Sequence, residues 1–211
     1  MIIEKSINVI LPSYLSQYPN CAKNREFKFI RSVNSFLKQP YQNKKLIIVS
    51  DGCEITNYLY TSHFGNYSNI TLISLPKQDT LSGKVRQTGI NYCEQNSIIC
   101  YLDSDDELIG NHLGSINEQF NTELFDFVYY DDYIASDNNL IGVRQVTLDA
   151  GKIGTSTISH INKFEYSWTD CDGYGHDWQF INNCFLKKNK NGIKIYNTGY
   201  LVHHIPNICD N

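Results

Sequence analysis

Short runs of apolar residues alternate with amphipathic segments through the first half of the chain. Each run has the length of a strand and ends at a proline or an acidic residue, which indicates a strand buried on both faces. The expected strands are 7–11, 46–49, 70–75 and 98–102, which end at Pro12, Asp51-Gly52, Pro76 and Asp103.

Apolar residues three and four positions apart predict helices between these strands. Because strands joined by helices form parallel sheets, the first 110 residues are expected to have an α/β fold. A ligand is then expected at the carboxyl ends of the strands. The periodic positions are Phe27, Ile30, Val33 and Leu37, with Asn24 as N-cap and Pro40 beyond the end, and Val85, Ile90 and Cys93 after Ser82.

The second half of the chain is less regular. Helical periodicity recurs twice, two further strands are expected, and a segment rich in Gly, Ser and Thr separates them from a terminal hairpin. No repeat and no low-complexity linker occurs, so residues 1–211 are expected to form a single domain. The expected elements are a helix through Leu113, Ile116 and Phe120, strands at 125–133 and 141–147, a helix from His176 through Trp178, Ile181 and Phe185, and a hairpin at 193–203.

Composition narrows the function classes. The 211 residues are 41% hydrophobic with a formal net charge of −4, which fits a globular protein without a broad nucleic-acid surface. The seven cysteines form no C-x-x-C pair, so they favour reduced thiols over a zinc ribbon. No apolar run approaches the roughly 20 residues of a membrane helix, and no export signal opens the chain. A cytoplasmic protein without a transmembrane segment is expected.

Three polar segments follow predicted strands and are therefore expected to line one cleft. In Asp103-Ser104-Asp105-Asp106 the carboxylates repel one another unless a cation lies between them, and oxygen ligands favour Mg²⁺ or Mn²⁺. A solvated acidic turn is the alternative. Asp51 can accept from a base N–H or a ribose hydroxyl, although Asp-Gly is also an ordinary turn. The third segment is Pro12-Ser13-Tyr14.

Other charged residues fall at predicted helix starts or near the end of the chain. Lys84 and Arg86 open a helix where an anion such as a diphosphate is favoured, with a solvated face as the alternative. Asp177 is either a helix cap or a general base. Of His203 and His204, at most one is expected to be a metal ligand, because adjacent strand residues point to opposite faces.

Taken in order, these segments resemble the family 2 glycosyltransferases through nearly the whole chain. Six segments match the family's motifs in the right order. They are INVILPSY at 7–14, FIRSVNSFLKQPYQNKKLIIVSDG at 29–52, GKVRQTGI at 83–90, YLDSDD at 101–106 for D-x-D-D, GHDWQF at 175–180 for E-D-W, and HHIPN at 203–207 for the closing histidine region.

The resemblance implies a GT-A type α/β fold, with a mostly parallel central sheet flanked by helices and a smaller antiparallel part on the acceptor side. Residues 1–110 would bind the nucleotide-sugar and residues 111–211 the acceptor. In the acceptor half, the segment 154–175 carries three aromatic residues that could stack on a sugar or belong to the core, Tyr166, Trp168 and Tyr174.

The resemblance also implies roles for individual residues. Those on the donor side are Pro12, Ser13, Tyr14 and Asp51 for the nucleoside, Lys84, Arg86 and Ser104 along the nucleotide, and Asp103 at the ribose or the metal. Asp105 and His204 would bind Mn²⁺ or Mg²⁺, and Asp177 would be the catalytic base. The chain departs from the family pattern at Ser50, Gln87 and His176, where the family has Asp, Asn and Glu.

The implied activity is metal-dependent transfer, with inversion, of a sugar from a UDP-sugar to a hydroxyl of a glycan, lipid-linked or other acceptor. Two other readings stay open. A degenerate module that binds a nucleotide-sugar without turnover is favoured by His176 alone. A nucleotidyltransferase calls for a Gly-rich basic loop after the first strand, and residues 11–15 contain neither glycine nor charge.

Overall fold

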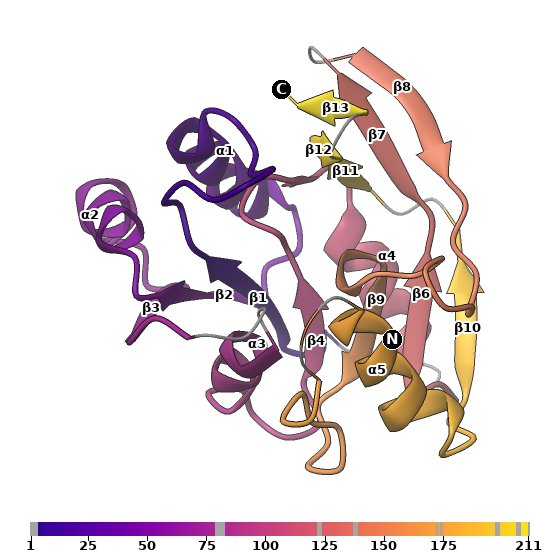
Figure 1. The fold of residues 1–211 in the computed structure, drawn as a ribbon. Helices are drawn as coiled ribbons and strands as arrows, with labels where there is room; N and C mark the ends of the chain where they lie inside the picture. The colour runs from indigo at the N-terminus through magenta and orange to yellow at the C-terminus, as the bar shows by residue number, and fades with distance from the viewer. Residues whose placement is uncertain are drawn as a thin grey trace.

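A seven-stranded sheet forms the centre of the molecule (Figure 1). The computed structural model describes residues 4–78, 83–121, 124–136, 139–171, 173, 175–196, 199–205 and 208–210. Among these strands only β9 is antiparallel to its neighbours, β4 and β6. In spatial order the strands are β10 (Gly192–Ile195), β6 (Phe127–Tyr130), β9 (Ile158–Ile161), β4 (Ile98–Tyr101), β1 (Ile7–Ser13), β2 (Lys44–Asp51) and β3 (Ile70–Leu75).

Helices cover both faces of this sheet, with α1 and α2 on one side of β1–β3 and α3 on the other (Figure 1). None of the helices in the described part of the chain has the length and apolar composition needed to cross a membrane. The helices are α1 (Arg25–Lys38), α2 (Glu54–His63), α3 (Gly83–Ile90), α4 (His112–Phe120), α5 (His176–Ile181), a 3₁₀ turn at Thr155–Thr157 and a π-helical turn at Asn182–Leu186.

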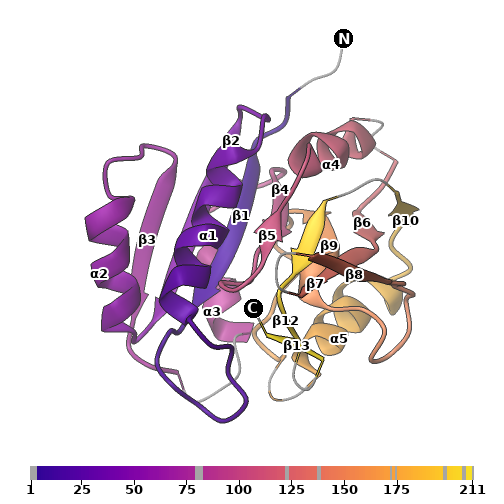
Figure 2. The ribbon, with the colours of Figure 1, turned by 90° about the horizontal axis from the view of Figure 1, so that it is seen from above.

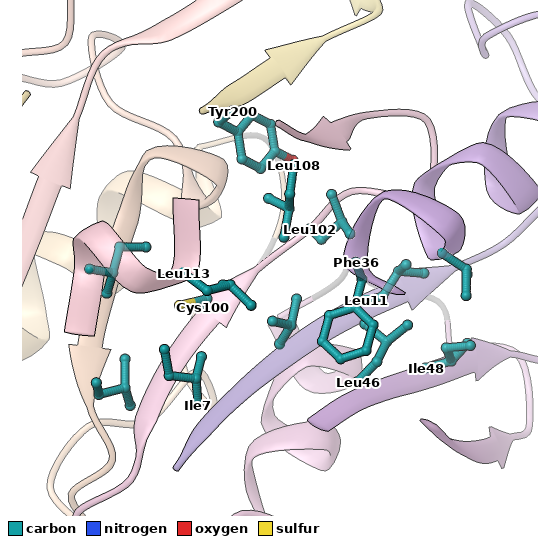
Figure 3. Packing of buried hydrophobic residues seen from close by; sticks show 14 of the residues in the cluster. Ile7, Leu11, Phe36, Leu46, Ile48, Cys100, Leu102, Leu108, Leu113 and Tyr200 are labelled. Atoms are coloured by element: carbon teal, nitrogen blue, oxygen red, sulfur yellow. The ribbon is translucent and has the colours of Figure 1, made fainter. Parts of the chain in front are cut away.

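Alternation along the strands divides the interior into two clusters. Ile7, Val9 and Leu11 face the cluster under α1 and α4, whereas Ile10 faces the cluster under α3 and α5. Figure 3 shows the first cluster, in which Phe36 packs near Leu46 and Leu113 lies near Cys100. The first cluster contains residues from both halves of the chain, so the two halves pack on a shared core.

A smaller four-stranded sheet lies beside the central one (Figure 2). Two of its three pairings are antiparallel and one, β7 with β11, is parallel. Its strands are β5 (Glu107–Leu108), β11 (Tyr200–Val202), β7 (Asp132–Ser136) and β8 (Asn139–Arg144), and a two-stranded piece follows, β12 (His204–Ile205) with β13 (Cys209–Asp210). The arrangement confirms the GT-A type expectation of a mostly parallel sheet with a smaller sheet at its side.

The first predicted strand is longer than expected, because β1 continues through Pro12 to Ser13. Leu102 N–H donates to the Ile10 carbonyl, so the backbone N–H and C=O groups of every second residue of β1, counted from Ile10, are directed toward β4. The backbone nitrogen of Pro12 is therefore also on the β4 side, but the β1–β4 pairing has already ended at Tyr101. The missing N–H of proline therefore costs no ladder hydrogen bond.

Several expectations for the elements were wrong. Phe27 is 64% exposed on α1, and Phe29, two positions away, points into the core instead. Asn24 precedes α1, but its side chain makes no capping bond. The strand expected at 125–133 is split into β6 and β7, which belong to different sheets. The hairpin expected at 193–203 does not form, since β10 pairs with β6 and β11 pairs with β5 and β7.

Replacing His112 by asparagine is expected to make stability less sensitive to acid. Burial lowers the pKa of His112 to about 3, and its Nδ1 accepts from Gly199 N–H at 3.2 Å. Below about pH 6.5 the unfolded chain binds a proton that the folded chain does not, so stability present at neutral pH is lost by up to about 1.4 kcal/mol per pH unit.

Asparagine retains an acceptor and does not titrate, but it loses the ring contacts with Tyr130 and Tyr200, so H112N should be less stable than wild type near pH 7. The difference between the two proteins should shrink as the pH falls, which urea unfolding at about pH 7 and about pH 5 measures. A difference that stays constant would mean that folding does not lower the pKa of His112.

Candidate functional site

A cleft of about 760 Å³ opens at the carboxyl ends of β1, β2 and β4. This volume lies in the range of small-molecule sites. The three polar segments that follow the predicted strands do meet there, as parallel topology requires. The predicted site residues that line the cleft are Pro12, Ser13, Tyr14, Asp51, Arg86, Asp103, Ser104, Asp105, Asp177 and His204.

At one end of the cleft, Asp51 is held by the segment that follows β3. Its Oδ2 lies 2.6 Å from Lys77 Nζ, and its Oδ1 accepts from Gln78 N–H at 2.7 Å. Gly52 has φ of +62°, and a Cβ there would lie 2.5 Å from Lys77 N, so only glycine allows this close approach. Lys77 Nζ also lies 4.5 Å from the centre of the Tyr14 ring.

Sequence analysis did not identify Lys77 as a site residue, although its position after a predicted strand would have allowed this. Pro76-Lys77 follows a predicted strand just as Asp51 and Asp103 do, so the same strand-end rule would have found it. Ser13 is part of the cleft wall but is buried, and its hydroxyl lies 2.8 Å from Thr56 Oγ1. Its hydroxyl therefore helps to fix the start of α2 against β1.

The acidic turn is held from two sides. Tyr200, fully buried on β11, accepts from Asp103 N–H at 3.0 Å and donates to Asp106 Oδ2 at 3.1 Å. On the other side, Ser32 of α1 donates to the Asp103 carbonyl and Arg31 to the Asp105 carbonyl. The backbone of the turn is thus fixed by residues far away in sequence.

The three aspartates of this turn differ in their partners. Asp103 Oδ1 lies 3.0 Å from Arg86 Nη2, and Asp106 accepts from Tyr200 and from His203 N–H. Within the described residues, the Asp105 carboxylate receives no hydrogen bond. Of the three, Asp105 is therefore the carboxylate most open to a ligand in the cleft.

Burial and mutual repulsion raise the pKa values of two carboxyl groups in this turn. Burial raises the pKa of Asp106 well above its usual range, and the nearby charges of Asp105 and Asp103 add to the effect. Burial also raises the pKa of Asp103. The charge of Arg86 lowers this pKa, and the negative charges of Asp105 and Asp177 raise it. A divalent cation in the cleft would relieve this repulsion, so the donor set fits Mn²⁺ or Mg²⁺.

Asp177 lies at the start of α5, opposite the acidic turn. Its Oδ1 accepts a short hydrogen bond from Thr155 Oγ1 and lies 3.0 Å from His176 Nε2. Burial opposes ionisation, but the hydrogen bonds from His176 and Thr155 and the charge of Arg86 outweigh it, so the pKa of Asp177 lies below its usual range. Asp177 is therefore a carboxylate at neutral pH and can accept a proton.

The two histidines near the end of the chain have different surroundings, and His203 lies between β11 and β12 instead of within a strand. His203 is buried with Nε2 2.7 Å from Glu107 Oε1, whereas His204 lines the cleft. His204 Nε2 lies 3.1 Å from the Asn20 carbonyl and its Nδ1 3.3 Å from Asp210 Oδ1. Nε2 thus has a backbone partner, whereas Nδ1 has the ion-pair contact with Asp210 but no hydrogen bond to a described residue.

No three His, Cys, Asp or Glu side chains are gathered as a metal-binding group in the described ranges. Asp103 and Asp105 line the cleft on the same turn, whereas His204 lines it from β12 and contacts Asn20 and Asp210. The segment Pro206-Asn207, which completes the H-x-x-N resemblance, lies outside the described residues.

Some expected residues lie away from the cleft. Lys84 is exposed on α3 and is not part of the lining, unlike Arg86. Trp168 and Tyr166 are buried core residues, so neither is available to stack on a sugar, and Tyr174 lies outside the described residues. The lining residues that the sequence reading missed include Tyr18, Arg25, Lys77, Arg144, Thr155 and Ser156.

Comparison with known proteins gives consistent matches. Residues 21–185 match the family described as "Glycosyl transferase family 2". A curated relative from Escherichia coli, "UDP-Glc:alpha-D-GlcNAc-diphosphoundecaprenol beta-1,3-glucosyltransferase WfgD", is 27% identical over 136 residues, or 64% of this chain and 49% of the relative. The chain therefore spans about half the length of that protein.

Solved structures of S. aureus TarS match 93% of this chain and about 60% of the TarS 1–349 chain. The complex with UDP has a TM-score of 0.70 at 16% identity. The complex with UDP-GlcNAc has a TM-score of 0.68 at 17% identity and is covered over 58% of its length. At these identities the likeness establishes the fold. The family match over most of the chain, on a GT-A type fold, means that this protein belongs to glycosyl transferase family 2.

Proposed function

We propose that this chain is an inverting, metal-dependent glycosyltransferase that moves a sugar from a UDP-sugar to an acceptor hydroxyl. The observation that carries the proposal is the cleft itself, in which the carboxylate of Asp177 faces the acidic turn across Arg86. The E. coli relative is named for UDP-glucose, and the TarS structures contain UDP and UDP-GlcNAc. These names favour UDP as the carrier and disfavour a degenerate binding module.

In this proposal, different lining residues bind the donor, stabilise the leaving group and accept the proton. Asp51 and Tyr14 hold the nucleoside, and Arg86 faces the departing diphosphate. Asp177 accepts the proton of the acceptor hydroxyl as its oxygen attacks the anomeric carbon from the side opposite the diphosphate. A Mn²⁺ or Mg²⁺ ion held by Asp105 and Asp103 would supply positive charge to the diphosphate.

The acceptor class is proposed from the curated relative, which is named for a GlcNAc-diphosphate lipid. Purified protein with UDP-glucose or UDP-GlcNAc, Mn²⁺ and a short-chain GlcNAc-diphosphate lipid is expected to release UDP and to form a β-linked product. UDP release is measured by coupled assay and the linkage by the anomeric proton coupling. Release of pyrophosphate instead of UDP would favour a nucleotidyltransferase, and no release with any UDP-sugar would overturn the proposal.

A further inference from the structure

His176 occupies the position where the family pattern has glutamate, and among the described residues its ring nitrogens contact three groups at the edge of the cleft. Nδ1 lies 3.0 Å from the Gly173 carbonyl. Nε2 lies 3.0 Å from Asp177 Oδ1 and 3.4 Å from Arg86 Nη1. The ring is largely buried and packs near Trp168, at a centroid distance of 6.1 Å.

The carbonyl of Gly173 can only accept, so Nδ1 carries a proton and donates to it. Nε2 is then the nitrogen that faces both a carboxylate and a guanidinium. A protonated Nε2 donates to Asp177, and a neutral one accepts from Arg86. The protonated ring therefore joins Asp177 to the pair that Arg86 makes with Asp103, whereas the neutral ring hydrogen-bonds only Arg86 through Nε2.

The two oxygens of Asp177 have different surroundings. Oδ1 lies 3.0 Å from His176 Nε2 and accepts a hydrogen bond from Thr155 Oγ1. Oδ2 faces Gly154, where a Cβ would lie 3.7 Å from it, and no described residue donates a hydrogen bond to Oδ2. Two contacts on one oxygen fix the rotation of the carboxyl group and leave Oδ2 beside Gly154, which lines the cleft.

We propose that His176 is a positioning residue, which with Thr155 holds Oδ1 of Asp177 so that Oδ2 is presented to the acceptor hydroxyl. The inference rests on the proposed function and adds a role for a residue that departs from the family pattern. A glutamate here could pair with Arg86 but would place a second negative charge beside Asp177. Protonated at both ring nitrogens, histidine instead offers a donor to the base and leaves its carboxylate anchored.

Two substitutions separate this role from a structural one. An asparagine amide reaches about as far as Nδ1, so H176N can keep the contact with Gly173 but loses the contact with Asp177. A glutamine amide reaches about as far as Nε2, so H176Q can donate to Asp177 and accept from Arg86. H176N is expected to lower kcat about 10- to 100-fold, with KM for the UDP-sugar within about twofold of wild type. H176Q should recover most of the loss.

The exposed His63 of α2 provides the matched control, since H63N and H63Q should leave kcat unchanged. An H176N variant with wild-type kcat would overturn the inference. A lower kcat in H176Q together with an unchanged kcat in H176N would also overturn it, because the contact with Gly173 would then be the one that affects kcat. In a D177N background, H176N should cause no further loss, and an additive loss would show that His176 does not act through Asp177.

A readout without turnover keeps the inference separate from the proposed function. In the imidazole ¹⁵N spectrum, D177A should shift the Nε2 resonance of His176 and leave Nδ1 nearly in place, with H176N providing the assignment. An unmoved Nε2 resonance would overturn the inference even in an active enzyme. A shifted resonance in a protein that releases no UDP would overturn the proposed function alone.

Discussion

Replacing Asp177 by asparagine is expected to lower kcat about 10²- to 10⁴-fold while leaving the affinity for the UDP-sugar close to that of wild type. The amide keeps an oxygen that can accept from Thr155 and lie beside His176, so the local structure should be retained. It cannot take a proton from the acceptor hydroxyl. Because the interaction is made only as the hydroxyl reacts, the loss falls on kcat rather than on donor binding.

Initial rates of UDP release give kcat, and isothermal titration with the UDP-sugar gives the affinity. Asp170 is exposed and lies outside the cleft lining, so D170N is the matched control and should behave as wild type. A D177N protein with near wild-type kcat would mean that another group is the base. A parallel loss of donor affinity would place Asp177 in the donor site instead.

Replacing Asp105 by alanine is expected to abolish the Mn²⁺-dependent part of UDP binding. Asp105 is the carboxylate of the acidic turn that no described side chain or backbone N–H engages, whereas Asp103 and Asp106 have partners. A ligand at about 100 times its Kd stabilises a protein by roughly 2.7 kcal/mol. Wild-type protein should therefore melt at a higher temperature with UDP and Mn²⁺ together than with either alone, and D105A should lack this increase.

Asp149 is an exposed acid outside the cleft, so D149A serves as the control and should keep the response. An unchanged Mn²⁺-dependent shift in D105A would exclude Asp105 as a metal ligand. The same experiment on His204→Ala tests the further ligand. Because His204 contacts Asn20 and Asp210, its role depends on whether the ring leaves those partners when the metal binds.

The strand β9 illustrates what a local pattern misses. Ile158–Ile161 contains Ser159 and His160, and both are buried in the middle of the central sheet. His160 Nε2 lies 2.8 Å from Tyr101 Oη, and Ser159 Oγ lies 3.2 Å from Tyr130 Oη. The polar atoms are satisfied by residues 59 and 29 positions away, so a search for apolar runs has no means of finding the strand.

By itself, the sequence determined the parallel half of the sheet and the acidic turn at the end of β4. These follow from local signals, since strand periodicity and turn residues are set by the residues nearest in sequence. Of the two adjacent histidines, His204 lines the cleft and His203 does not, although His203 lies between β11 and β12 and not within a strand.

Only the tertiary structure decided which strands pair and which groups contact Asp177. Arg86 meets His176 across 90 positions of sequence, and Thr155 meets Asp177 across 22. The same holds for Tyr200 beneath the acidic turn and for the failure of β10 and β11 to form a hairpin. Such contacts depend on how the whole chain packs, because burial and hydrogen bonding over long separations leave no periodic mark on the residues that make them.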